Sequence, residues 1–210
     1  MAQVETRDSL LKAATAVFVE KGYAGARVDE IARRAGANKA MIYYHFGLKQ
    51  DLYQAVLLEL FSGLLDRMAE LGQAETDPLK RLVGFYGGLV RLFAERPALP
   101  RLMLREVTGG GRNMGNGPTK ALLAILRFVA TAMEEGVTQR RFRPAHPLLV
   151  HLSMIGPVML FFVGEGFRAR QLATFPLSVK APTLDDLIAH LTESLARTLL
   201  LAPAREPARS

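Results

Sequence analysis

Residues 26–52 read ARVDEIARRAGANKAMIYYHFGLKQDL, and this stretch decides the fold of the N-terminal part of the chain. Within residues 28–35, apolar side chains recur at the i, i+3, i+4 and i+7 positions typical of a short amphipathic helix. Gly36 then permits the left-handed backbone that a tight turn between two helices needs. Asn38 is suited to cap a second short helix, which is expected to end near Phe46. The pattern predicts two short helices joined by a tight turn.

The second of these helices carries an unusual set of side chains on the face turned away from the core. Ile42 and Phe46 lie four residues apart and are expected to point inward. A small side chain on the outer face allows close approach to a DNA major groove, and lysine and tyrosine can contact base edges or phosphates. The sequence therefore predicts a DNA-reading helix whose outer face and flank carry Lys39, Ala40, Tyr43 and Tyr44.

The rest of the chain also has helical periodicity, and no segment alternates convincingly as a strand. The fold class is therefore all-α, with a three-helix helix-turn-helix domain at the N-terminus, a larger helical bundle at the C-terminus, and about nine helices in all. A kink is expected at Pro157. The glycine-rich residues 108–118 are expected to form a mobile connection. Beyond the first helix of the bundle, helices are expected at residues 78–95, 97–107, 118–140, 144–170 and 183–201.

The expected domains follow from this division. Residues 1–50 form the DNA-binding domain, and residues 51–202 form a domain for ligand binding and dimerisation. Residues 203–210 contain no apolar side chain larger than alanine and proline, so a disordered tail is expected there.

The composition narrows the class of protein. The 210 residues carry a formal net charge of +7, which favours a polyanionic partner such as nucleic acid or a membrane surface. The chain has no cysteine, which excludes disulfides and cysteine-bound zinc and fits a cytoplasmic location. The N-terminus lacks the basic segment and apolar run of a signal peptide.

Residues 147–164 are apolar enough to raise the alternative of a membrane span. The segment is slightly shorter than the roughly 20 apolar residues that a span requires. It also contains His151, Gly156 and Pro157. A buried core helix is the better interpretation, and no membrane partner is expected.

No catalytic, metal or cofactor site is predicted. His146 and His151 lie five residues apart, which is not the i, i+4 spacing of a helical metal pair. The glycines at 109–111 lack the lysine and hydroxyl residue of a phosphate-binding loop. No serine lies in a Gly-x-Ser-x-Gly turn. An all-helical enzyme therefore remains only as a weaker alternative.

Three consecutive stretches resemble the TetR family of transcription regulators: FVEKGYAGARV, DEIARRAGANKAMIYYHF and GLKQDLYQAV. The resemblance covers about residues 6–60. It implies that Lys39, Ala40 and Tyr44 face bases and the adjoining backbone. It also implies that Tyr43, His45 and Lys49 contact phosphates, with Lys49 at the start of the fourth helix, whose free N–H groups favour an anion. The full predicted DNA interface is Arg27, Asn38, Lys39, Ala40, Tyr43, Tyr44, His45 and Lys49.

Two positions depart from the family pattern. The family usually places threonine or serine just before the second helix, where this chain has Ala26 and Arg27. The serine that usually precedes the lysine of the fourth helix is Leu48. Both changes remove hydroxyl caps worth about 1 kcal/mol each. Arg27 is expected to compensate by contacting phosphate directly.

The resemblance further implies a homodimer that binds a near-palindromic operator, and a small-molecule effector bound inside the bundle. The expected output is repression that an apolar or amphipathic ligand relieves, and an activator with the same architecture is the alternative. The dimer is expected to form through the apolar 147–163 helix together with a leucine stripe on the last helix, at Leu184, Leu187, Ile188, Leu191 and Leu195. The candidate ligand-pocket residues are Phe61, Phe93, Met103, Arg105, Phe128, His151 and Met154.

Overall fold

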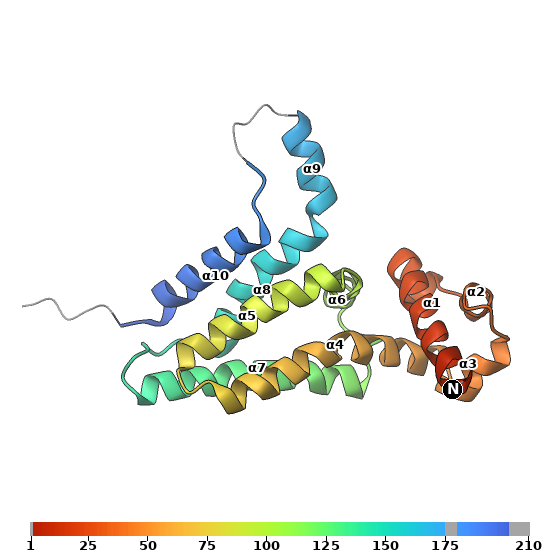
Figure 1. Ribbon diagram of the computed structural model, residues 1–210, viewed down its shortest axis with the longest axis horizontal. Helices are drawn as coiled ribbons and strands as arrows, with labels where there is room; N and C mark the ends of the chain where they lie inside the picture. The colour runs from red at the N-terminus through yellow and green to blue at the C-terminus, as the bar shows by residue number, and fades with distance from the viewer. Residues whose placement is uncertain (1, 175–179, 202–210) are drawn as a thin grey trace, which may run out of the picture.

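The computed structural model describes residues 2–174 and 180–201, and every element named within these residues is a helix (Figure 1). The all-α prediction is confirmed, with ten helices in the described part rather than about nine. The tail expected at residues 203–210 lies outside the described residues. The helices are α1 Ala2–Gly25, α2 Val28–Arg34, α3 Lys39–Phe46, α4 Lys49–Ala74, α5 Pro78–Glu95, α6 Ala98–Thr108, α7 Asn116–Thr138, α8 Pro147–Val163, α9 Glu165–Thr174 and α10 Leu184–Leu199.

The first three helices and the beginning of α4 form a small module at one end of the molecule (Figure 1). Each helix contributes apolar side chains to one core, and its fully buried members include Leu10, Phe18, Ile31, Ile42 and Leu52. Because α4 continues from this module into the bundle, the boundary expected between residues 50 and 51 falls within its first turn. Any rotation of α4 therefore moves the module with it.

The bundle is built around α4, α5 and α7, which lie against one another (Figure 1). Asp77 caps α5 by accepting hydrogen bonds from the N–H groups of Leu79 and Lys80, and Pro78 occupies its first turn. The inner face of α5 buries Phe85 and Tyr86. Helices α8 and α10 pack against the other side of α5 and against each other.

The C-terminal region differs from the sequence expectation at one break. Pro157 lies inside α8, and the chain instead turns at Gly164, so that α8 and α9 are bent by 67°. A Cβ atom at position 164 would lie 2.6 Å from the carbonyl oxygen of Leu160, which only glycine avoids. The prediction of one helix over residues 144–170 is therefore wrong, and α9 stands away from the bundle (Figure 1).

Helix α8 is not the buried core helix that its composition suggested. Only Val150, Met154 and Val158 are buried on it, whereas Leu149 and Leu160 are 64% and 70% exposed. Among the described residues, no single helix is long and apolar enough to span a membrane, and only the bent pair of α8 and α9 together meets that criterion of length and composition. The exposed leucines leave an apolar surface on this helix.

The glycine-rich connection between α6 and α7 is packed against the bundle. Its Met114 is buried, and Gly110 and Gly111 adopt φ values of 74° and 70°, which favour glycine. At Gly115 a Cβ atom would overlap the Gln54 side chain on α4 at 2.3 Å. The segment packs beside α4 around Met114 and Gly115, whereas residues 108–110 are exposed.

Candidate nucleic-acid interface

The turn between α2 and α3 has the geometry that the sequence indicated. Gly36 has a φ of 64°, and the Ala37 N–H donates to the carbonyl of Ala32 at 3.0 Å. Asn38 then caps α3, because its Oδ1 accepts a 3.0 Å hydrogen bond from the N–H of Ala40. The cap satisfies one of the free donors at the start of α3 and fixes the angle at which this helix leaves α2.

The outer face of α3 is exposed as expected. Ile42 is fully buried, whereas Tyr43 and Tyr44 are 47% and 69% exposed. Lys39 and Ala40 are also exposed, at the N-terminal end of the same helix. The structure therefore brings the four predicted groove-facing residues to one accessible surface, and their contact with DNA stays a prediction.

Lys39 is already paired on this surface. Its Nζ lies 2.9 Å from Oδ1 of Asp29 on α2. The hydrogen bond raises the pKa of Lys39 and lowers the pKa of Asp29. Sequence reasoning missed Asp29, because the pair joins two helices across the turn and no periodic pattern reports such a contact.

Lys49 begins α4 close to an aromatic ring. Its Nζ lies 4.6 Å from the ring centroid of Tyr23, and partial burial lowers its pKa. Leu48 supplies no side-chain cap, but its N–H donates to Oδ2 of Asp51 at 2.8 Å. Asp51 thus supplies the reciprocal half of a capping box, and the first-turn N–H groups receive no side-chain acceptor from position 48.

Arg27 and His45 occupy less favourable positions than the other candidates. Arg27 is the N-cap residue of α2 and makes no side-chain capping bond, so the expected loss of that cap is confirmed. It is exposed and free to extend. The Nε2 atom of His45 is buried and has no hydrogen-bond partner among the described residues. A phosphate contact by this atom therefore requires the ring to turn.

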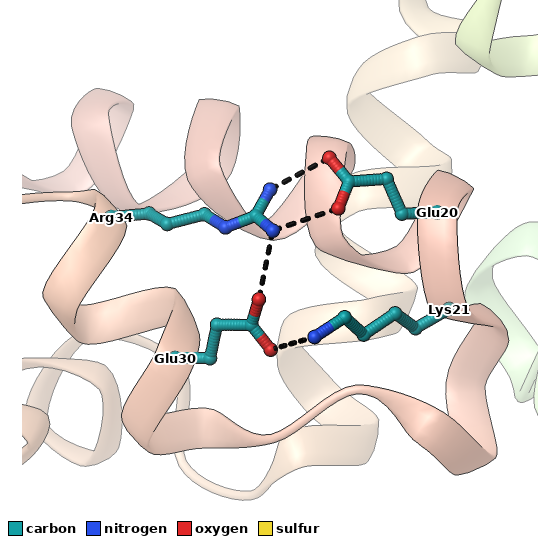
Figure 2. Close-up of polar contacts among 4 residues, drawn as sticks. All are labelled: Glu20, Lys21, Glu30 and Arg34. Carbon is teal, nitrogen blue, oxygen red and sulfur yellow. Dashed lines mark hydrogen bonds and ion pairs between the residues drawn. The ribbon is translucent and has the colours of Figure 1, made fainter.

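A network of ion pairs fixes α2 against α1 (Figure 2). Arg34 donates to both carboxylate oxygens of Glu20 at 2.7 Å and to Glu30 at 2.8 Å, and Lys21 lies 2.6 Å from Glu30. The paired carboxylates raise the pKa of Arg34. Because these groups are largely exposed, the network adds little to the folding stability. Its hydrogen-bond geometry instead orients the two helices relative to each other.

Most of the candidate ligand-pocket residues are core side chains. Four of them, Phe61, Phe93, Met103 and Met154, are buried core side chains, and Phe128 is half-buried against Phe85. Half-buried His151 lies with its Nδ1 3.0 Å from the hydroxyl of Tyr86.

Arg105 needs a correction, because it is exposed and points to the DNA-binding module. Its Nη2 donates to the carbonyl of Val19 on α1 at 3.2 Å. A side chain that binds the backbone of α1 cannot also line a pocket inside the bundle. The guanidinium instead ties α6 to the DNA-binding module.

The predicted dimer stripe also needs a correction. Leu187, Leu191 and Leu195 are buried within the chain, because α10 turns this face onto α5 and α8. They cannot supply the main contacts of an interface between subunits. Leu184 is exposed and Ile188 is half-buried, so these two remain accessible to a partner.

A buried carboxylate joins the module to the bundle, and sequence reasoning did not find it. Glu106 on α6 is 3% exposed, and its Oε1 accepts a 2.7 Å hydrogen bond from the Tyr53 hydroxyl on α4. Asn113 lies 3.5 Å from the same oxygen, and Oε2 has no partner in the described part of the chain. Tyr53 and Glu106 are 53 positions apart in the sequence, so no local pattern indicated the contact.

Sequence similarity to known proteins is concentrated in the N-terminal part of the chain. Residues 10–56 match the family model described as "Bacterial regulatory proteins, tetR family". The transcriptional repressor NicS of Pseudomonas putida is 40% identical over 83 residues, which are 38% of this chain and 39% of NicS. The transcriptional activator FasR of Mycolicibacterium smegmatis is 44% identical over 78 residues, which are 37% of this chain and 36% of FasR. The matches thus span less than half the length of these relatives.

Solved structures resemble the chain over nearly its whole length. The fatty acid degradation regulator FadR of Bacillus halodurans superposes with a TM-score of 0.69 at 19% identity, covering 90% of this chain and 94% of its own. FadR of Bacillus subtilis, solved in complex with stearoyl-CoA, gives a TM-score of 0.68 at 19% identity, covering 90% and 95%. At this identity the likeness shows a shared fold alone.

Proposed function

We propose that the chain belongs to the TetR family of bacterial regulatory proteins, whose model it matches over residues 10–56, and that it is a homodimeric, sequence-specific DNA-binding transcription regulator. We propose that it represses transcription and leaves its operator when a small apolar or amphipathic ligand binds the bundle. The relatives named above are transcription regulators, which supports a regulatory rather than an enzymatic role for this chain. As a regulator of bacterial DNA, it is proposed to act in the cytoplasm.

The observation that carries this proposal is the outer face of α3. A capped helix presents a lysine, an alanine and two tyrosines to solvent, above a fully buried Ile42. Solvation alone does not call for two exposed tyrosines side by side, whereas a major groove accepts their flat rings and hydroxyls. Lys49 at the start of α4 adds a positive charge beside free backbone N–H groups, which suits a phosphate.

The dimer is proposed to form through the apolar surface of α8. Leu149, Leu152 and Leu160 are exposed on this helix, and Leu184 is exposed at the start of α10. A two-fold axis beside α8 would bury these side chains against the same residues of a second copy. The two α3 helices would then read half-sites about 34–36 Å apart, or a multiple of that distance.

Ligand release is proposed to act through α4. This helix belongs to both the module and the bundle, so a ligand that favours another packing of the bundle changes the spacing of the two α3 helices. The ligand shifts DNA binding only as far as it binds one arrangement better than the other. A shift of a few ångströms disturbs a fixed half-site spacing.

A gel shift with DNA from upstream of the gene tests the proposal. We expect binding at low salt that falls by roughly 10³–10⁵ between 50 and 200 mM salt, given about 6–10 phosphate contacts per dimer. The double variant Lys39→Ala, Tyr44→Ala is expected to abolish the specific complex, whereas Lys120→Ala on α7 is a matched surface control. Absence of any specific complex for the parent chain would reject the function.

An activator is the second candidate, because FasR, named an activator, is 44% identical over its matched segment. The DNA-binding face is the same for both functions, so the gel shift does not separate them. A reporter gene placed downstream of the bound DNA separates the two functions. Higher expression without the regulator indicates a repressor, and lower expression indicates an activator.

A further inference from the structure

A cavity of about 540 Å³ lies at the elbow between α8 and α9. Its walls come from the end of α5, the end of α8, α9, and the segment that leads into α10. The volume lies within the range of roughly 300–1,000 Å³ that is typical of small-molecule sites. Among the pocket residues expected from the sequence, only Phe93 lines this cavity.

Aromatic rings form its inner wall. Phe93 and Phe162 meet edge to face with ring centroids 5.7 Å apart, and Phe161 and Phe162 do the same at 5.4 Å. Pro97 and Leu172 add aliphatic surface. These side chains offer a ligand dispersion contacts and no strong hydrogen-bonding group, so the inner part of the cavity suits an apolar group.

The charged side chains in the lining are Glu165 and Arg168, both on α9. Arg168 is held in place, because its Nη1 donates to the carbonyl of Leu160 at 2.9 Å and its guanidinium lies 4.6 Å from the ring centroid of Phe161. Within the described residues it pairs with no carboxylate. Four of its five N–H donors therefore remain for acceptor oxygens of a ligand.

The position of Arg168 favours an anion over a cation. A guanidinium stacked on an aromatic ring is weakly hydrated and presents a fixed fork of donors, so little of its freedom is lost on binding. Glu165 makes no ion pair with Arg168 and is exposed at the first turn of α9. Solvent therefore screens Glu165 more strongly than Arg168, which is half-buried against the wall.

We propose that this elbow cavity binds an amphiphile with an apolar tail and an anionic, oxygen-bearing head group. The tail lies against Phe93, Phe161 and Phe162, and Arg168 binds the head group. The assignment rests on the proposed ligand-responsive function and adds to it the place and the chemical class of the ligand. It also gives a role to α9, which buries none of its own side chains in the fold.

Isothermal titration calorimetry of the full chain tests this proposal with three probes that each contain a ten-carbon chain. Each probe is used below its critical micelle concentration. We expect decanoate to bind about tenfold or more tightly than decanol, the ratio that one charged hydrogen bond gives. Decyltrimethylammonium is expected to bind more weakly than decanoate. Equal binding of all three probes, binding of none, or tightest binding of the cation would overturn the assignment.

Three substitutions on α9 make the test specific. Arg168→Gln is expected to lower the affinity for decanoate to that of decanol and to leave decanol unchanged. Arg170→Gln removes the same charge two residues away, outside the cavity lining, and is expected to leave both affinities as they are. Ala169→Trp fills the cavity and should weaken both probes. Unchanged decanoate binding by Arg168→Gln contradicts the proposal.

DNA binding without amphiphile is measured on the same samples by gel shift. Intact DNA binding without decanoate binding would reject the cavity assignment alone. Decanoate binding that depends on Arg168, in a protein without specific DNA binding, would reject the proposed regulator function and leave the site standing.

Discussion

The Tyr53 hydroxyl on α4 donates a 2.7 Å hydrogen bond to the buried carboxylate of Glu106 on α6. The adjacent Arg105 donates to the carbonyl of Val19 on α1. The last turns of α6 therefore hold both the connecting helix and the first helix of the DNA-binding module. The ring centroids of Tyr53 and Tyr23 lie 5.2 Å apart, and the Tyr23 ring also lies 4.6 Å from Nζ of Lys49. A movement of α6 can therefore displace Lys49, a proposed phosphate-binding residue, through the side chains of Tyr53 and Tyr23.

Removing the donor of this bond is expected to destabilise the chain. Tyr53→Phe leaves the buried Glu106 carboxylate without its shortest hydrogen bond, at a cost of about 1–3 kcal/mol in the free energy of unfolding. Glu106→Gln keeps an acceptor oxygen and carries no charge, so it should cost less. Urea unfolding at one protein concentration measures both. Tyr23→Phe, which alters a neighbouring hydroxyl, is the control, and equal stabilities of Tyr53→Phe and the parent would contradict the prediction.

Asp29 is expected to restrain DNA binding. Asp29→Asn removes a negative charge beside Lys39 and frees the ammonium for DNA. Affinity should rise by roughly two- to tenfold, the effect of one unit charge near phosphates in water. Fluorescence anisotropy with a labelled operator measures it. Asp66→Asn, an exposed change on the bundle part of α4, should leave affinity unchanged. Weaker binding by Asp29→Asn would mean that the carboxylate instead orients Lys39 for contact.

Residues that contact phosphates and residues that face bases should respond differently. Tyr43→Phe and Lys49→Ala are expected to weaken binding to all sequences alike, because phosphates carry no sequence information. Lys49→Ala should also lower the salt slope by about one for each phosphate that the lysine no longer neutralises. Lys39→Ala and Tyr44→Ala should change the preferred bases, by about tenfold or more at the contacted position. Selection from a randomised operator library separates the two groups, and identical preferences in all four variants would refute the assignment.

The dimer surface is tested by comparing leucines that differ in burial. Leu152→Asp places a charge on the exposed face of α8 and should give folded monomers in light scattering. Leu123→Asp, at a similarly exposed leucine on α7, should stay dimeric. Leu191→Asp buries an unpaired charge within one chain and should unfold the protein, at a cost of several kcal/mol. A stable Leu152→Asp dimer would place the interface elsewhere.

His151 is expected to make stability depend on pH. Burial lowers the pKa of His151 in the folded chain below the ordinary 6.5. Between the two values the unfolded chain binds a proton that the folded chain does not, so stability falls as pH drops below about 6.5. His151→Gln should flatten that part of the curve, measured by thermal unfolding at several pH values. His190→Gln, an exposed change on α10, is the control. The same slope in parent and His151→Gln would exclude His151 as its source.

The sequence by itself determined the helix-turn-helix. The apolar spacing of residues 28–35, the glycine at 36 and the cap at Asn38 act over fewer than about ten residues, and such local terms can be read without the rest of the chain. The same holds for Ile42, whose position opposite Tyr44 follows from helical geometry alone. The resemblance to the TetR family could be read from the same segment, because the residues that carry it are local too.

Only the tertiary structure decided which apolar faces are covered. A leucine stripe such as that of α10 looks the same in sequence whether its own chain or a second copy covers it, and here the chain itself buries Leu191 and Leu195. Of the two apolar helices expected at the interface, α8 is the one that keeps a broad exposed face. The cavity beside Arg168 arises from a bend at Gly164, where a backbone contact admits no Cβ atom. The contacts of Lys39 with Asp29 and of Tyr53 with Glu106 join separate helices, so they exist only once the helices have packed.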